Sequence, residues 1–165
     1  MAIEKAGYEV ILKENQFEIR MYEPMVIAIS EETDLRGYSG FNEAFNYISG
    51  SNEDRSKISM TTPVLNDLDG HLTTAFVMPK EYKLEDLPKP TSRNLSLRQI
   101  EQRKCAALSF SGNANPSTVQ NKIEELKQWL QTKNLTPIGG FQLARYNPPF
   151  IPGFLKKNEV IIEIL

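Results

Sequence analysis

The order in which strand-like and helix-like segments follow one another constrains the fold of this 165-residue chain more than any other feature. A strand, an amphipathic helix and two further strands are predicted in residues 25–32, 38–49, 57–65 and 72–79. The same order returns in residues 95–112, 116–132, 139–146 and 158–165, with a break near residue 100. The repetition predicts an α+β fold from two β-α-β-β units, packed as one twisted antiparallel sheet or partly closed barrel with both helices against it.

Two segments have the hydrophobic period of an amphipathic helix. The apolar residues of the first recur at helical spacing: Phe41, Ala44, Phe45 and Ile48. Those of the second also share one face: Val119, Ile123, Leu126 and Leu130. Asn115 can cap the second helix, and Pro116 suits its first turn, where a missing N–H loses no hydrogen bond.

Residues 17–22 alternate in the way that strand residues do. One face would carry Phe17, Ile19 and Met21, and the other would carry Glu18, Arg20 and Tyr22. Because one set is apolar and the other mostly polar, the alternation predicts a half-buried strand. Residues 8–13 before it are predicted to form another strand.

Length and composition indicate one globular domain over residues 1–165. Hydrophobic residues make up 40% of the chain and charged residues 24%, which is ordinary for a globular protein. Residues 80–94 are charged and contain two prolines, and Pro79 precedes them, so we expect a surface loop that joins two halves of one domain. The seam between two similar halves is a favourable place for a ligand groove.

Charge and hydropathy exclude several classes of function. The net charge of -2 argues against a nucleic-acid-binding surface, which is normally basic. No run approaches the roughly 20 apolar residues of a membrane span, and residues 1–13 lack the apolar core of a secretory signal. The single cysteine, Cys105, is expected to be buried and fits a reducing compartment. We therefore expect a cytoplasmic protein with no nucleic acid or membrane as its partner.

The sequence contains no recognisable catalytic motif. His71 is the only histidine, and it follows Gly70 in a predicted turn, where a nucleophile-base pair would have to use it from an exposed loop. A nucleophile elbow, a phosphate-binding loop and a dinucleotide fingerprint are all missing. These observations favour a binding protein over an enzyme.

Three segments carry a resemblance to a known family. They are Phe17-Glu18-Ile19-Arg20-Met21-Tyr22, then Lys57-Ile58-Ser59-Met60-Thr61-Thr62-Pro63-Val64, and finally Tyr146-Asn147-Pro148-Pro149-Phe150-Ile151-Pro152 with Lys156-Lys157-Asn158-Glu159-Val160. In this order and at this spacing they resemble the SOUL haem-binding protein family over nearly the whole chain. The resemblance implies a distorted β-barrel with two helices, similar to the effector-binding domains of certain transcription regulators, and an apolar groove associated with tetrapyrrole binding.

The resemblance also bears on how haem iron would be held. In an animal member of the family, a histidine proposed as the axial ligand directly follows the segment that matches Phe17-Glu18-Ile19-Arg20, and Met21 stands at that position here. A methionine thioether can ligate haem iron. Met21 is therefore a weak candidate ligand, and its place beside Phe17 and Ile19 favours a packing role instead.

Candidate ligand-binding residues come from four parts of the sequence. We expect the walls of the groove and the contacts to acidic groups of the ligand to come from Met21, Phe41, Phe45, Met60, Phe150, Phe154, Lys156 and Lys157. Because neighbouring strand residues point to opposite faces, only one of the two lysines can face a site. Haem, or a related planar apolar ligand, is the expected cofactor.

Two other functions fit the same fold. A small-molecule hydrolase would need a buried Glu or Asp beside a tyrosine in the cleft, with a raised pKa. A protein-interaction module would have its groove filled by its own side chains and an exposed apolar patch elsewhere. The structure can distinguish these alternatives.

Overall fold

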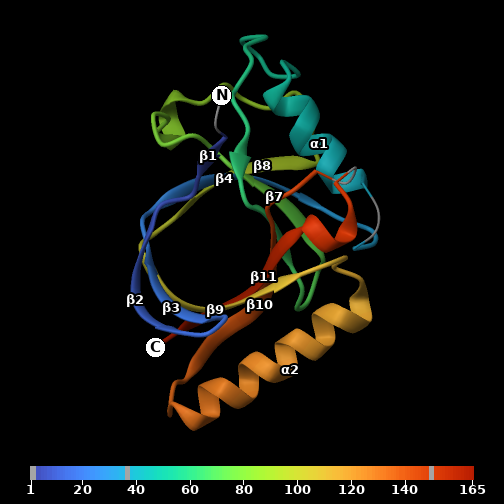
Figure 1. Ribbon diagram of the computed structural model, residues 1–165. Helices are drawn as coiled ribbons and strands as arrows, with labels where there is room; N and C mark the ends of the chain where they lie inside the picture. The colour runs from blue at the N-terminus through green and yellow to red at the C-terminus, as the bar shows by residue number, and fades with distance from the viewer. Residues whose placement is uncertain (1–2, 36–37, 149–150) are drawn as a thin grey trace.

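The computed structural model describes residues 3–35, 38–148 and 151–165 (Figure 1). Its two α-helices are α1 (Ser39–Ile48) and α2 (Pro116–Thr132), and the 3-10 turns η1 (Leu84–Asp86) and η2 (Gly153–Leu155) lie in loops. The strands are β1 (Glu4–Lys5), β2 (Tyr8–Glu14), β3 (Phe17–Tyr22), β4 (Met25–Glu31), β5 (Thr61–Thr62), β6 (Val64–Asp67), β7 (Thr73–Val77), β8 (Leu95–Ile100), β9 (Arg103–Ser111), β10 (Pro137–Arg145) and β11 (Lys157–Ile164).

Nine strands form one antiparallel sheet in the order β2-β3-β9-β11-β10-β6-β7-β4-β8. Within it, β4-β7-β6 and β9-β11-β10 are the strands of two β-α-β-β units, and the units meet where β6 pairs with β10. Figure 1 shows the sheet curled into a partly closed ring with both helices on its outside. The α+β fold with two repeated units, predicted from the order of segments, is confirmed.

The strand that precedes each unit in the chain pairs with the other unit. Strand β3 precedes the first unit in the chain but pairs with β9 of the second unit. Strand β8 precedes the second unit but pairs with β4 of the first. Each half of the chain therefore supplies a strand that pairs with the other half.

Local chemistry explains where the observed elements differ from the predicted ones. The strand predicted over residues 57–65 is interrupted: residues 57–60 are irregular, β5 is only two residues long, and β6 begins after Pro63. Proline has no N–H to give to a sheet, so it separates β5 from β6. The break expected near Ile100 lies at Glu101 and Gln102.

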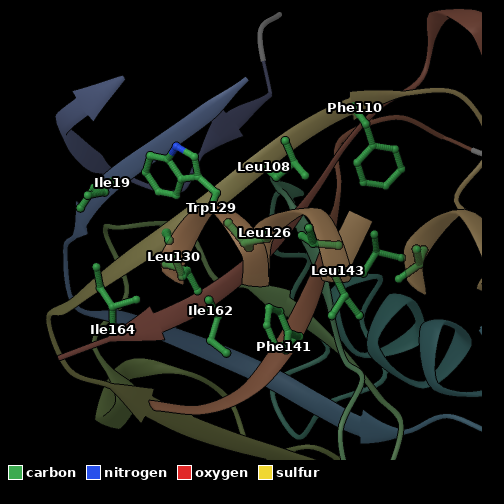
Figure 2. Close-up of a cluster of buried hydrophobic side chains, with 14 residues drawn as sticks. Ile19, Leu108, Phe110, Leu126, Trp129, Leu130, Phe141, Leu143, Ile162 and Ile164 are labelled. Carbon is green, nitrogen blue, oxygen red and sulfur yellow. The ribbon is translucent and has the colours of Figure 1, made fainter. Parts of the chain in front are cut away.

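Helix α2 begins and packs as its sequence predicts. The side chain of Asn115 accepts a hydrogen bond from the backbone N–H of Thr118, and Pro116 opens the helix. Its apolar face lies on the outer face of β9, β10 and β11 (Figure 2). Trp129 stacks on Phe17 with 4.9 Å between ring centroids. This cluster fixes the half of the molecule that contains α2.

The inner face of the curled sheet corrects the prediction for residues 17–22. Arg20 is 1% exposed and Tyr22 is 2% exposed, so the face of β3 that carries them is buried too, and more completely than the face of Phe17 and Met21. The alternation was read correctly, but the strand is not half-buried. The sheet closes over the second face, and strands distant in the sequence cover it.

Candidate functional site

A groove of about 490 Å³ lies over the seam between the two units, bounded by α1 on one side and by the start of α2 on the other. Such a volume is in the range of small-molecule sites, roughly 300–1,000 Å³. The residues that line it are Ile3, Leu35, Tyr38, Phe41, Phe45, Met60, Thr62, Val64, Asn113, Ala114, Asn115, Arg145, Tyr146, Asn147, Pro148, Lys156 and Asn158. Most of this surface is apolar and aromatic. The groove is open, so it is not filled by its own side chains.

Four of the predicted ligand-binding residues meet in this groove. Phe41 and Phe45 come from successive turns of α1, and their rings lie parallel with centroids 6.0 Å apart. Met60 lies on the segment directly before β5. Lys156 lies directly before β11. Phe45 is 48% exposed, so its ring is available to a ligand rather than used up in the core.

The structure places three other predicted residues outside the groove lining. Met21 is half-buried on β3, where it pairs with Glu9 of β2 and Lys104 of β9. Phe154 is 78% exposed in η2, and Lys157 is exposed with its Nζ 5.0 Å from the ring centroid of Tyr146. Phe150 lies outside the described residues.

Arg145 is the charged residue of the groove that sequence reasoning missed. It ends β10, where it pairs with Val64 of β6 and Asn158 of β11, on the floor of the seam. Burial lowers the pKa of its guanidinium, and the negative charge of Glu32 partly opposes that effect. The available signal was its place directly before the Tyr146-Asn147 motif, at the end of a strand.

A buried carboxylate holds α1 beside the groove. The side chain of Glu32 accepts hydrogen bonds from the hydroxyl of Ser39 (2.6 Å), the backbone N–H groups of Gly40 (3.0 Å) and Phe41 (3.2 Å), and the hydroxyl of Thr74 (2.9 Å). Burial alone would raise the pKa of Glu32, but these hydrogen bonds outweigh it and lower the pKa. Glu32 thus satisfies the free N–H groups at the start of α1 and links the helix to β7.

Beneath the groove, a polar cluster is sealed inside the curled sheet. Glu159 is 0% exposed. Its carboxylate accepts hydrogen bonds from both terminal nitrogens of Arg20, from the hydroxyl of Tyr146 (2.6 Å) and from the hydroxyl of Ser109 (2.9 Å). Arg20 also donates to the hydroxyl of Tyr22 (2.8 Å). Tyr146 belongs to both regions, because the residue is part of the groove lining and its hydroxyl reaches the cluster.

This cluster tests the hydrolase alternative. A buried glutamate does lie beside a tyrosine at the cleft, as that alternative requires. Burial acts to raise the pKa of Glu159, but the Arg20 guanidinium and the hydroxyl donors outweigh it, so the pKa is lowered. The carboxylate is ionised with both oxygens occupied, so this pair offers neither a general acid nor a free base. The arrangement is that of a structural ion pair.

The described residues were also compared with the requirements of a metal site, a reactive cysteine and a membrane-spanning helix. Residues 3–35, 38–148 and 151–165 contain no group of three or more His, Cys, Asp or Glu side chains placed to hold a metal ion. Cys105 is buried, and burial raises the pKa of its thiol to about 11. Within the same ranges, neither helix combines the length and apolar character needed to cross a membrane.

The fold is shared with several solved structures of low sequence identity. The C-terminal domain of EcmrR superposes with a TM-score of 0.69 at 8% identity, over 91% of this chain and 97% of that one. An uncharacterized conserved protein from Listeria innocua gives 0.67 at 13% identity, over 92% and 93%. A hydrolase from Listeria innocua gives 0.63 at 14% identity, over 94% of each chain. At such identities the likeness shows the fold alone.

Sequence comparison identifies the family. No curated protein is similar enough to count as a match. The model of the family described as SOUL heme-binding protein matches residues 3–163, which is nearly the whole chain. That match spans both β-α-β-β units and every residue of the groove lining. The chain therefore belongs to the SOUL haem-binding protein family.

Proposed function

We propose that this protein binds haem or a related planar tetrapyrrole in the groove between α1 and the start of α2, and acts as a cytoplasmic carrier, buffer or sensor rather than as an enzyme. One observation carries the proposal: an open, mainly aromatic groove lies at the seam of a chain that belongs to a haem-binding family.

The groove residues suit a flat apolar ring. The parallel rings of Phe41 and Phe45 offer a wall on which a planar ligand can lie, and Met60 and Val64 supply aliphatic contacts. Burying a few hundred Å² of such a ring gains on the order of 10 kcal/mol at about 25 cal/mol per Å². Because association costs roughly 4–15 kcal/mol, we expect modest affinity from the apolar contacts alone.

The residues present also limit how iron would be held. Bound haem would supply an iron that His, Cys, Met or Tyr side chains can ligate. Among the described lining residues there is no His or Cys, and the groups of the required type are Met60, Tyr38 and Tyr146. The hydroxyl of Tyr146 already donates to Glu159. The chain therefore suits the ring and its substituents better than the metal, and Met60 is better placed than Met21 as a sulfur ligand.

Titration of the purified protein with hemin tests the proposal. We expect a saturable shift of the Soret band, with the affinity falling at least about tenfold in a Phe41→Ala/Phe45→Ala double variant, because two ring contacts are lost. Met21→Ala is the matched control, since Met21 lies outside the groove lining and its variant should keep the wild-type spectrum. No Soret shift, or a shift unaffected by the double variant, would contradict the proposal.

A further inference from the structure

We propose that the η2 patch, which consists of Phe154, Leu155, Lys156 and Lys157, docks the protein on anionic membrane surfaces. The partner is the lipid surface itself, whichever ligand the groove binds. Three properties of these residues support the proposal: their exposure, the anchoring of their backbone and their charge.

The apolar half of the η2 patch is exposed to solvent. Phe154 is 78% exposed and Leu155 is 60% exposed, although they are neighbours in one short turn. Apart from the terminal Leu165, they are the most exposed large hydrophobic side chains of the described residues. A single exposed apolar side chain is ordinary, but two adjacent ones of this size indicate a surface that binds something.

The backbone of the turn is fixed to the rest of the protein. The N–H of Gly112, directly after β9, donates to the carbonyl oxygen of Lys156 (3.2 Å). The N–H of Lys157 donates to the side chain of Asn147 (2.6 Å). The exposed side chains therefore project from an ordered turn, so their insertion into a partner requires little further ordering of the backbone.

The part of the chain around the η2 patch is positively charged. Residues 111–123 and 146–158, whose ends meet where Ser111 pairs with Lys157, contain three lysines and no Asp or Glu. The whole chain has a net charge of -2, so these two segments differ in sign from the rest of the protein. Their charge is complementary to that of an anionic surface.

The two lysines of the patch contact uncharged groups. The Nζ of Lys156 donates to the side-chain oxygen of Asn113 (3.3 Å), and the Nζ of Lys157 lies 5.0 Å from the ring centroid of Tyr146. Neither contact neutralises an ammonium group. The cytoplasmic leaflet of a membrane carries anionic lipids that attract lysines near its surface, and salt weakens this attraction.

A lipid surface fits the η2 patch better than a protein surface does. An aromatic side chain contributes roughly 150–250 Å² of contact area, so two apolar side chains offer far less than the roughly 800 Å² that each partner buries in a standard protein interface. Side chains that insert at the boundary of headgroups and acyl chains need no complementary shape. We expected no membrane partner because the sequence has no long apolar run, but a turn that touches only the membrane surface needs no such run.

The η2 patch and the groove are adjacent. Lys156 belongs to the patch and also to the groove lining. A protein docked through the patch therefore holds the groove next to the bilayer, from which an apolar molecule can enter it.

Vesicle co-sedimentation tests the proposal. The wild type should bind phosphatidylcholine vesicles that contain about one-third phosphatidylserine, and bind pure phosphatidylcholine at least about fivefold more weakly. Phe154→Ser/Leu155→Ser should lower the partition coefficient at least about tenfold, because two apolar side chains no longer insert. Lys156→Gln/Lys157→Gln should remove the preference for phosphatidylserine, and raising the NaCl concentration should weaken binding of the wild type.

Two matched controls change similar residues elsewhere. Ile11→Ser replaces an apolar side chain on β2 that is 53% exposed, and Lys83→Gln/Lys89→Gln removes two exposed lysines on either side of η1. Both should bind vesicles as the wild type does, and circular dichroism should show every variant folded. A wild type that binds neither vesicle would overturn the proposal in favour of a protein partner. Losses in the patch variants no larger than those in the controls would overturn the assignment to this turn.

Tryptophan fluorescence reports insertion directly. The emission of Phe154→Trp should shift to the blue when phosphatidylserine-containing vesicles are added, because the new indole enters the headgroup region. Ile11→Trp should show no shift, and Trp129, which is 9% exposed, contributes the same background to both variants. An unchanged emission of Phe154→Trp on vesicles would contradict docking through η2.

Discussion

The hydroxyl of Tyr146 donates a 2.6 Å hydrogen bond to Oε1 of Glu159, and this bond joins the open groove to the sealed interior of the sheet. Two regions with different chemistry meet at it. On one side lies an apolar cleft with positive charge, and on the other a buried ion pair between Glu159 and Arg20. The position of Tyr146 in the groove lining thus depends on a buried polar cluster.

Removing one member of the buried ion pair should be strongly destabilising. Glu159→Gln leaves Arg20, which is 1% exposed, with Glu18 as its remaining carboxylate partner. Breaking such a pair costs about 3–5 kcal/mol of the free energy of unfolding. Urea denaturation followed by circular dichroism measures it. The exposed Glu125→Gln serves as control and should change stability by less than about 0.5 kcal/mol.

The same pair allows a sharper test with a double variant. Replacing Arg20 by Met and Glu159 by Leu removes both fully buried charges together and leaves Glu18, whose side chain is 14% exposed, beside Lys13. Such replacements are often neutral or stabilising. The double variant should therefore be more stable than Glu159→Gln alone. A double variant as unstable as the single one would show that the cluster contributes more than charge pairing.

Gly40→Ala should destabilise the protein, although the same change inside most helices stabilises by about 1 kcal/mol. A Cβ at residue 40 would lie 2.7 Å from the backbone oxygen of Glu31 and 3.0 Å from Oε2 of Glu32. Crowding of this kind costs about 1–3 kcal/mol. Thermal denaturation should show a lower Tm for Gly40→Ala, and Asn46→Ala, at an exposed position of the same helix, should leave Tm unchanged or raise it.

Stability should depend on pH through Glu32. Its folded-state pKa lies below the usual glutamate value, so the ionised form stabilises the fold at pH above about 4.5, and that contribution is lost as the pH falls through the folded-state pKa. Glu32→Gln removes this contribution. The stability difference between wild type and Glu32→Gln, measured by urea denaturation, should be largest near pH 7 and shrink below about pH 4. A difference that stays constant over this range would contradict the assignment.

The sequence predicted what local patterns determine. Helix α2 occupies residues 116–132 as expected, because its cap, its first-turn proline and its apolar period all lie within one segment. Two β-α-β-β units followed from the order of such segments. Phe41 and Phe45 could be placed in the groove because helical spacing puts them on one face of α1.

What the sequence did not reveal depends on contacts between distant segments. Arg20 and Glu159 are 139 residues apart, and only closure of the sheet brings them together. Arg145 became a site residue because β10 pairs with β6 at the seam, a pairing that no short motif encodes. Met21 occupies the family's ligand position in sequence, yet β3 carries it away from the groove lining.

The most direct test of this account is where a ligand binds. Protoporphyrin IX added to isotopically labelled protein should shift the backbone amide NMR signals of residues on both sides of the seam, with the largest changes near Phe41, Met60 and Arg145. Changes concentrated instead around His71 and Arg93, which line a separate polar pocket, would contradict a site between the two halves.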